Sequence, residues 1–413
     1  MKKYEKYKDS GIEWLGEIPV HWKLAPIKHL FSFATGFTPP TNRSDYYDGE
    51  IDWVTIADMN EKFISKSKSK ITNKAIQELT KEPVPKGSLL YSFKLSVGKV
   101  GFAAKELFTN EAIFSIFPKE GLALSYYYYA LPEILIHNAN ENIYGAKLLN
   151  QELILNSLML SLPLIEQKTI AQYLDFTIDK IEQLISEKST LISKLHEKRK
   201  ALINEVVTKG LNPNAPMRDS GIEWLGMIPE HWRISKIKYL ADLKSGTNLT
   251  SEVIEPVGNF PVYGGNGLRG FYGSYTDDGH YILIGRQGAL CGNINYAKGQ
   301  FWATEHAVVC YPKLDFKTIW FGELLRTMNL NQYSIASAQP GLAVERIKNL
   351  TIPFPSIEEQ SEIVNFIESR TTKIDQTISE TQLQIQKLKE YKTAVISEVV
   401  TGKVDVREWK AST

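Results

Sequence analysis

Nine polar residues in two loop-rich stretches have side chains of the types that hydrogen-bond the edges of nucleic-acid bases. Arg and Lys suit guanine, Asn and Gln suit adenine, and Ser can serve either. The candidates in residues 23–164 are Asn42, Arg43, Lys94, Ser96 and Lys99, and those in residues 233–355 are Asn266, Arg269, Arg286 and Gln287. The alternative interpretation of each one is an ordinary exposed loop position.

The charge of the chain neither requires nor forbids a nucleic-acid partner. The net charge is +1, which argues weakly against nucleic-acid binding by the chain alone. The charge is unevenly distributed, because residues 61–105 contain ten lysines against three glutamates, a local excess of +7. Such a run is either a solvated face or a patch that meets phosphates. Any DNA binding must therefore come from local patches or from a partner.

No set of residues has the spacing of a catalytic or metal centre. The sequence contains no G-x-x-x-x-G-K-[ST] loop for nucleotide phosphates. Its only Pro-Pro pair, in residues 38–41, lacks the flanking residues that amino-methyltransferases use. His21 and His231 each precede a tryptophan, where a structural role is favoured. Cys291 and Cys310 form neither a disulfide framework nor a metal-ligand pattern. We therefore expect a chain without catalytic residues, metal or cofactor.

The sequence also lacks the apolar segments of a membrane or secreted protein. The longest weakly polar stretch, residues 148–165, is interrupted by two asparagines, a glutamine and a glutamate, and it falls short of a membrane helix. The basic N-terminal residues have no apolar segment behind them, so no secretion signal is expected. These features predict a cytoplasmic protein.

The chain contains an internal duplication. Residues 9–22 and 219–232 are identical at twelve of fourteen positions, and residues 167–208 align without a gap to 360–401 with eighteen of forty-two identical. Little similarity survives between the repeated pieces. The order is therefore repeated segment, variable region, helix, and then the same again. Such an arrangement indicates one scaffold that displays two different readers, and it predicts a pseudo-twofold molecule.

The second repeated piece has the pattern of a coiled coil. Successive d and a positions are apolar at eight of ten places in residues 174–206 and at seven of ten in residues 367–399, in the same register. We expect the interface to be formed by Leu174, Ile178, Ile181, Ile185, Ile192, Leu195, Leu202, Ile367, Ile374, Ile378, Ile385, Leu388 and Val395. Because both copies lie in one chain, an antiparallel pair about 60 Å long is predicted. The alternative is a simple dimerisation device.

The two variable regions predict mixed α/β domains with the same plan. Each alternates short apolar runs with glycine-rich turns, and residues 108–117 match residues 302–311 so that Glu111 aligns with Glu305. Glu305 and its neighbour His306 have no nucleophile or ligand cluster beside them in the sequence.

These observations divide the chain into five segments. We expect a first domain in residues 1–165, a helix in 166–208, a second domain in 209–358, a second helix in 359–402 and a tail in 403–413. The C-terminal segment leads towards the N-terminal repeat much as residues 206–217 lead into the internal copy. The two termini should therefore lie close together.

The repeated DSGIEWLG segments, the P-x-I-E-Q-like starts of the helices and their INEVVT-like ends resemble the specificity subunit of type I restriction–modification systems. The resemblance covers essentially the whole chain. It implies two target-recognition domains, each reading one half of a bipartite double-stranded DNA site. The helices would set the unread spacer and dock two methyltransferase (M) subunits, and restriction (R) subunits would join the full complex.

The resemblance also implies that this chain is a non-catalytic subunit of a restriction endonuclease and adenine methyltransferase complex. S-adenosylmethionine, ATP and Mg²⁺ are expected on the partner subunits. The start of the first helix departs slightly, because SLPLIEQ is shorter and has one acidic residue where IPFPSIEEQ has two. An alternative function is a coiled-coil adaptor that binds only protein, and it would show no sequence-specific protection or methylation of DNA.

Overall fold

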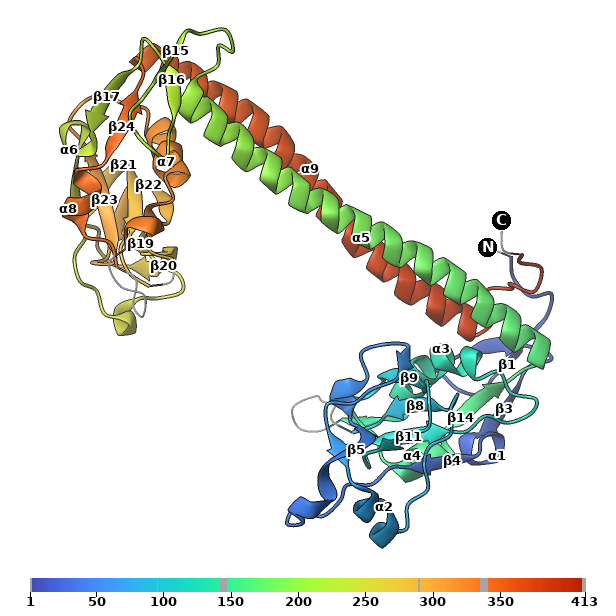
Figure 1. Ribbon diagram of the computed structural model, residues 1–413. Coiled ribbons are helices and arrows are strands. Elements are labelled where there is room, and N and C mark those ends of the chain that lie inside the picture. The colour runs from blue at the N-terminus through green and yellow to red at the C-terminus, as the bar shows by residue number, and fades with distance from the viewer. Residues whose placement is uncertain (1, 95, 142–146, 289, 335–340, 411–413) are drawn as a thin grey trace. The chain divides into compact units, whose positions relative to one another are not determined.

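The computed structural model describes residues 2–94, 96–141, 147–288, 290–334 and 341–410 of the chain (Figure 1). The chain divides into two compact units. Unit 1 comprises Met1–Glu187 and Gln384–Thr413, and unit 2 comprises Lys188–Leu383. Each unit therefore contains one α/β domain and half of each of the two long helices.

The α/β domain of unit 1 is built on a five-stranded sheet. Its strand order is β4 (Phe33–Thr35), β11 (Ile113–Ile116), β8 (Leu89–Ser92), β9 (Val100–Ala103) and β6 (Phe63–Ile64). All neighbours are antiparallel except β6 and β9, which are parallel. A three-stranded sheet adjoins it, in the order β10 (Phe108–Thr109), β5 (Tyr47–Val54) and β7 (Lys70–Ile71).

Alternating side chains bury both faces of this five-stranded sheet. Leu89 and Tyr91 of β8 join the core under helix α3 (Leu124–Leu135), which contributes Tyr127 and Leu131. Leu90, between them, joins the core on the other face. The remaining elements of unit 1 are short: β1 (Tyr7–Asp9), β2 (Glu17–Pro19), β3 (Lys23–Pro26), α1 (Ile27–Leu30), α2 (Asn73–Leu79), β12 (Asn140–Glu141), β13 (Lys147–Leu148), α4 (Gln151–Asn156) and β14 (Leu158–Ser161).

Unit 2 repeats this plan in a six-stranded sheet. The order is β18 (Ala241–Ser245), β23 (Ala307–Pro312), β21 (Asp277–Gly285), β22 (Ile294–Ala303), β19 (Phe260–Gly264) and β20 (Gly267–Tyr272). Its other elements are β15 (Met217–Asp219), β16 (Met227–Pro229), β17 (Arg233–Lys236), α6 (Ile237–Leu240), α7 (Thr318–Thr327), α8 (Val344–Lys348) and β24 (Thr351–Phe354). Helix α7 covers the face that carries Ile282 and Ile284 of β21, and Leu283 joins a separate cluster.

The two domains share one topology. Strands β4, β11, β8 and β9 correspond in order and direction to β18, β23, β21 and β22. The parallel pair of β5 with β10, Trp53 opposite Phe108, corresponds to that of β19 with β22, Val262 opposite Trp302. The hairpin β1–β2 and the pair β3–β14 correspond to β15–β16 and β17–β24. This correspondence confirms that the two variable regions share a mixed α/β plan despite their different sequences.

The long helices are α5 (Leu164–Lys209) and α9 (Ile357–Val400), and their heptad positions are the buried ones. Each of the thirteen predicted interface residues is buried or half-buried. In unit 1, Lys392 pairs with Glu182, and Leu174 shares a core with Val395. In unit 2, Arg199 pairs with Asp375 at 3.0 Å. Both pairs match the early part of one helix with the late part of the other, so the pairing is antiparallel, as predicted.

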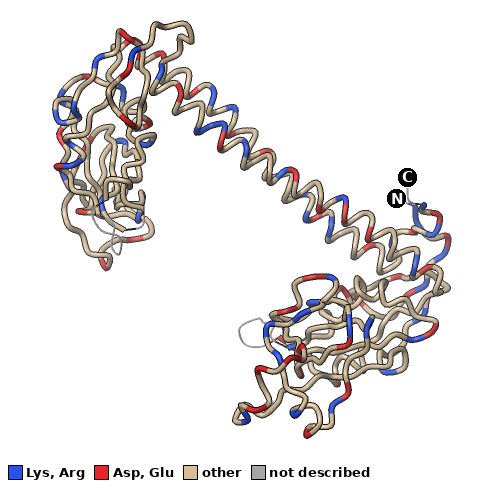
Figure 2. Tube along the Cα trace, in the orientation of Figure 1, with Lys and Arg blue, Asp and Glu red and all other residues tan. Residues whose placement is uncertain are grey.

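Charged residues of both signs are interspersed along α5 and α9 (Figure 2). Neither helix thus has all its basic or all its acidic residues gathered in one stretch. This pattern is typical of a solvated coiled-coil surface with a few ion pairs across the helices.

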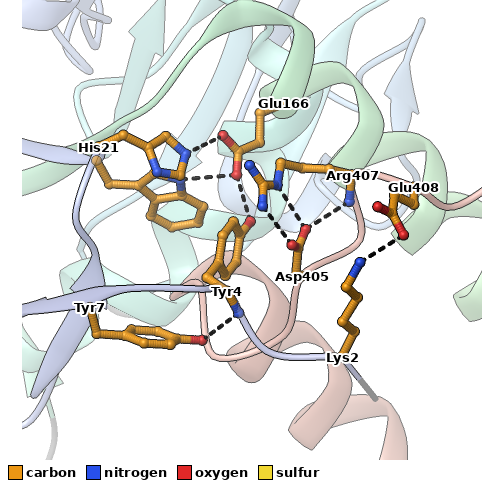
Figure 3. Close-up of polar contacts among 9 residues, drawn as sticks. Lys2, Tyr4, Tyr7, His21, Glu166, Asp405, Arg407 and Glu408 are labelled. Carbon is orange, nitrogen blue, oxygen red and sulfur yellow. Dashed lines mark hydrogen bonds and ion pairs between the residues drawn. The ribbon is translucent and has the colours of Figure 1, made fainter.

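The start of each long helix ties the repeated segments to their domain. Glu166 accepts hydrogen bonds from Trp22 Nε1 at 3.1 Å and from the Tyr4 hydroxyl at 2.5 Å, and its other oxygen lies 2.8 Å from His21 Nε2 (Figure 3). In unit 2, Glu359 bonds His231 and Trp232 in the same way. The repeated histidines therefore hold the scaffold together, in agreement with a structural role.

The glutamine that follows each of these glutamates fixes the helix on the sheet. Gln167 Oε1 accepts from the backbone N–H of Ala123, the residue that precedes α3, at 2.8 Å. Gln360 Oε1 accepts from the N–H of Lys317, which precedes α7, at 2.9 Å. Both glutamines satisfy a donor at a helix start that would otherwise lack a partner. The repeated E-Q pair thus has the same two duties in both units.

The two ends of the chain meet in unit 1. The backbone N–H of Asp405 donates to the carbonyl of Lys2 at 2.9 Å, and Lys2 Nζ lies 2.8 Å from Glu408 Oε2. Arg407 pairs with Asp405 and lies over the Tyr4 ring at 4.9 Å, and the same close-up shows these contacts (Figure 3). The predicted proximity of the termini is therefore confirmed.

Candidate nucleic-acid interface

A cleft of about 890 Å³ opens in unit 2 and brings together three of its four predicted base-reading residues. These three residues are Asn266, Arg269 and Gln287. The other residues that line the cleft are Asn248, Leu249, Thr250, Ser251, Gly265, Gly288, Glu305, His306 and Gly341. Arg286, the fourth predicted residue, is next to Gln287 in the chain and donates from Nη1 to Ser245 Oγ at 3.1 Å. Three of the predicted residues therefore lie around one cleft, beside five other polar side chains.

Several segments from distant parts of unit 2 form the walls of this cleft, and the β19–β20 hairpin supplies Gly265, Asn266 and Arg269. Three other segments follow β18, follow β21 and precede β23, and hydrogen bonds join them: Gly246 N–H to Ala307 O at 3.0 Å and Arg286 N–H to His306 O at 2.9 Å. A Cβ at Gly246 would lie 2.2 Å from the carbonyl oxygen of Ala303, so only glycine allows this approach.

Unit 1 has a cleft of about 620 Å³ in the corresponding place. Lys94, Asn110 and Glu111 line it together with Thr55, Ile56, Ala57, Ala112, Leu148 and Leu149. The segments that follow β8 and precede β11 line it and are joined by Phe93 N–H to Ala112 O at 3.0 Å. The segment that follows β4 bonds the latter through Gly36 N–H to Ile113 O at 3.3 Å but does not line the cleft. A Cβ at Gly36 would also collide with the backbone, at 2.0 Å from the carbonyl oxygen of Thr109.

The strand registers match the residues of the two clefts position by position. Ser92 pairs with Ile113 in unit 1 as Gly285 pairs with Ala307 in unit 2. Counting from these pairs, Lys94 corresponds to Gln287 and Glu111 to Glu305, and counting from Gly36 and Gly246, Thr38 corresponds to Asn248. The clefts therefore share the turns of Lys94 and Glu111 with those of Gln287 and Glu305, whereas Thr38, unlike Asn248, does not line its cleft.

The other predicted residues of unit 1 are engaged within their own domain. Arg43 forms a two-bond pair with Asp45, bonds Glu78 at 3.1 Å and lies over the Tyr46 ring at 4.2 Å. The Arg43 guanidinium holds the pKa of the Asp45 carboxyl well below its usual range. Asn42 is exposed beside this network. Arg43 thus holds its loop in place.

Lys99 and Ser96 lie on the loop that also carries Lys94. Lys99 Nζ donates to the carbonyl of Ile56 at 3.2 Å and to Asn60 Oδ1 at 3.1 Å. The Ser96 carbonyl accepts from Ser92 Oγ at 2.5 Å, which shapes the loop. Both residues therefore position the loop, and the exposed Lys94 is the one that faces the cleft.

The candidates of unit 2 are held at the cleft by polar neighbours. Arg269 donates from Nη2 to Ser251 Oγ at 2.9 Å, and Asn266 Oδ1 accepts from Asn293 Nδ2 at 3.0 Å. Gln287 forms an isolated β-bridge with Gly341. The Arg269 and Asn266 side chains are each held through one contact, and Gln287 is held through its backbone. All three residues remain exposed, and this arrangement leaves further hydrogen-bonding groups for a ligand.

Among the cleft residues that were not predicted from the sequence are an asparagine, a glutamate and a histidine. Asn248 lies on the segment after β18, and Glu305 and His306 form the turn before β23. Glu305 Oε2 and His306 Nδ1 are buried and have no hydrogen-bond partner within the described part of the chain. The alignment of Glu111 with Glu305 was the signal in the sequence that could have indicated this turn.

The residues that the structure describes contain neither a candidate metal site nor a candidate membrane-spanning helix. Among them, no group of three or more His, Cys, Asp or Glu side chains could hold a metal ion. In the same residues, no helix combines the length and the apolar character that crossing a membrane requires.

Comparison with known proteins identifies the family. A model of the type I restriction modification DNA specificity domain matches residues 19–193 and 229–387. The EcoprrI specificity subunit of Escherichia coli is 28% identical over 387 residues, which cover 89% of this chain and 90% of that protein. The MjaIX specificity subunit of Methanocaldococcus jannaschii is 34% identical over 127 residues, or 30% of this chain and 29% of that protein.

Solved structures support the same fold. A chain from a structural study of complex assembly and conformational transition of the type I R-M system superimposes with a TM-score of 0.72 at 13% identity, covering 93% of this chain and 98% of that one. The HsdS subunit from Thermoanaerobacter tengcongensis gives a TM-score of 0.56 at 14% identity, covering 94% and 98%. With two matched segments that span most of its length, the chain belongs to the type I restriction modification DNA specificity family and is the non-catalytic DNA specificity subunit of a type I restriction–modification system.

Proposed function

We propose that each of the two clefts reads one half of a bipartite double-stranded DNA site. The recognition domains would comprise residues 1–165 and 209–358, with Lys94 and Gln287 at equivalent reading positions. The observation that carries this proposal is the pair of matched clefts, which share the turn that follows β8 or β21 and the turn that precedes β11 or β23 but differ in most of their polar side chains. Two readers of different half-sites need this combination, because base identity is read by donor and acceptor pattern.

The other residues that were predicted to contact DNA have different roles in this proposal. Arg269, Asn266 and Arg286 would support reading at the unit 2 cleft. Lys99, Ser96, Asn42 and Arg43 would position loops or meet phosphates in unit 1. Phosphate contacts fix orientation without carrying sequence information, so their loss should weaken binding without changing the motif.

Two further clefts support a complex with two M subunits. One, of about 680 Å³ in unit 1, is lined by Trp14, Leu15 and Glu398, and the other, of about 520 Å³ in unit 2, by Trp224, Leu225 and Glu205. These are the same residue types from the same repeated pieces. These three matched residues suit two copies of one partner, whereas the polar residues of the reading clefts differ. R subunits would join this assembly in the cytoplasm, and helices 166–208 and 359–402 would set the spacer.

The proposal is tested with the chain assembled with its M subunits. Lys94→Ala should alter the methylated motif in one half-site and Gln287→Ala in the other, as read by methylation-sensitive sequencing of cellular DNA. Lys313→Ala is a control, because Lys313 is exposed on unit 2 and does not line its reading cleft. If both variants changed the same half-site, or if no complex methylated a bipartite motif, the proposal would be wrong.

A further inference from the structure

Both reading clefts carry a glutamate at the same position of the turn that precedes the matched strand. Glu111 is exposed and accepts a hydrogen bond from the Thr38 hydroxyl. Glu305 is 35% exposed at its side chain, and its Oε1 lies 3.1 Å from His306 Nε2. The internal partner therefore differs between the units, although the glutamate is the same.

This difference separates these glutamates from those that hold the scaffold. Glu166 and Glu359 keep the same partners in both units, a histidine and a tryptophan of the repeated segment. A residue kept for an internal contact would be expected to keep that contact. No shared contact within the described residues accounts for Glu111 and Glu305, so a partner outside the chain is the simpler explanation.

The chemistry of the major groove supplies such a partner. A carboxylate is repelled by phosphates, and on a DNA-facing surface it costs affinity unless it meets a donor. The donors that the major groove offers are the exocyclic amino groups of cytosine and adenine, and carboxylates accept from the cytosine N4 group. In unit 2 the carboxylate has unused acceptor capacity, because Glu305 Oε2 is buried without a hydrogen-bond partner among the described residues, while the side chain as a whole is 35% exposed.

We propose that Glu111 and Glu305 are specificity-determining residues, each accepting a hydrogen bond from the exocyclic amino group of a cytosine or adenine in its own half-site. Lys94 and Gln287, which face the same clefts, would read an adjacent base and make the half-sites differ. This inference rests on the proposed function of the two clefts. It adds one amino-bearing base at an equivalent place in each half-site.

The test uses the chain assembled with its M subunits and a duplex of the motif that the wild-type complex methylates. In successive duplexes, each cytosine or adenine of one half-site is replaced by an analogue without the exocyclic amino group. One replacement should weaken binding by the wild-type complex roughly tenfold. The same replacement should have little further effect on Glu305→Ala, and Glu305→Ala should accept other bases at that position of the methylated motif.

Two further variants make the outcome decisive. Glu305→Gln keeps an acceptor but loses the charge, so it should retain more discrimination than Glu305→Ala. Asp315→Asn removes one negative charge from an exposed residue of unit 2 that does not line the cleft, and its motif should be unchanged. If Glu305→Ala and Glu305→Gln both raised affinity for all sequences and kept the wild-type motif, the carboxylate would only repel DNA and the inference would fall.

The failure of this inference differs from the failure of the proposed function. If no amino-group replacement affected wild-type binding while Gln287→Ala still changed one half-site, the clefts would read DNA without the glutamates. This outcome would overturn the inference alone. If neither the glutamate nor the Gln287 variants changed the motif of a working complex, both would be overturned. The wild-type measurements on modified duplexes apply even if a variant fails to fold.

Discussion

Residues that hold the domains together are distinct from those that face the clefts. Glu166 illustrates the first group: its side chain is 3% exposed, and Tyr4 together with His21 and Trp22 of the repeated segment converges on it. A buried carboxylate of this kind is stable only while its partners remain in place. The glutamate of unit 2 has two donors and is 21% exposed.

The contrast between Glu166 and Glu359 predicts that glutamine in place of each glutamate lowers the free energy of unfolding by different amounts. Glu166→Gln should lower the free energy of unfolding by about 2 kcal/mol, because at least one buried donor loses its acceptor. Glu359→Gln should cost less, about 1 kcal/mol, because its donors are fewer and water reaches them. Chemical denaturation of the two variants checks this order, and equal costs would contradict the assigned networks.

The contact between the chain termini should depend on pH. Arg407 lowers the pKa of Asp405, chiefly through their hydrogen bonds. Because the folded pKa lies below the unfolded value of about 3.9, this carboxylate contributes stability above that pH, and the contribution is lost as the pH falls through the folded pKa. Asp405→Asn should therefore lower stability by about 1 kcal/mol at pH 7.

The difference between the wild-type chain and this variant should shrink as the pH is lowered through the acid range. Hydrogen exchange of the backbone amides of residues 2–9 measures the stability of the local contact. Denaturation at each pH measures the free energy of unfolding of the protein. A difference that stayed constant from neutral to strongly acidic pH would show that the pair does not act through ionised Asp405.

At the scale of elements, the long helices are the part most fully predicted from the sequence. Their heptads depend on residues three and four apart, so the pattern is local, and each predicted interface residue is buried or half-buried. The clefts could be predicted only in part, because residues near 37, 94 and 111 meet through strand register and not through spacing. Register is a property of the whole sheet. Lys94 and Gln287 could be predicted from their residue types and their positions in polar loops. Asn248, Glu305 and His306 were not predicted, because only the strand register brings them to the cleft.

The element-scale prediction concerns spacer length. Removing residues 185–191 and 382–388 deletes one heptad from each helix, and both deletions lie between the positions of the Glu182–Lys392 and Arg199–Asp375 pairs. These pairs can then form again in the same register. The methylated motif should keep both half-sites and have a shorter spacer, as measured by methylation-sensitive sequencing.

A deletion from one helix alone serves as the control for that experiment. This single deletion shifts the a and d positions of one helix relative to those of the other. The ion pairs and the apolar a and d contacts then cannot all form, so the free energy of unfolding should fall. An unchanged spacer in the double deletion would contradict the view that the helices set this length.

At the scale of the whole molecule, two kinds of surface follow from one duplication. The repeated pieces give identical residues at the Trp14 and Trp224 clefts, which suit two copies of one partner. The diverged regions give equivalent clefts with different polar residues, which suit two different half-sites. The net charge of +1 fits this division, because phosphate neutralisation by partner subunits would supply affinity that the chain lacks.

The central claim is that each domain reads its half-site independently on a shared scaffold. Exchanging residues 233–355 for the corresponding region of another specificity subunit tests it most directly. The chimera, assembled with its M subunits, should methylate a motif in which one half-site is the donor's, while the other half-site and the spacer stay unchanged. Changes in both half-sites, or an unchanged motif, would contradict the account.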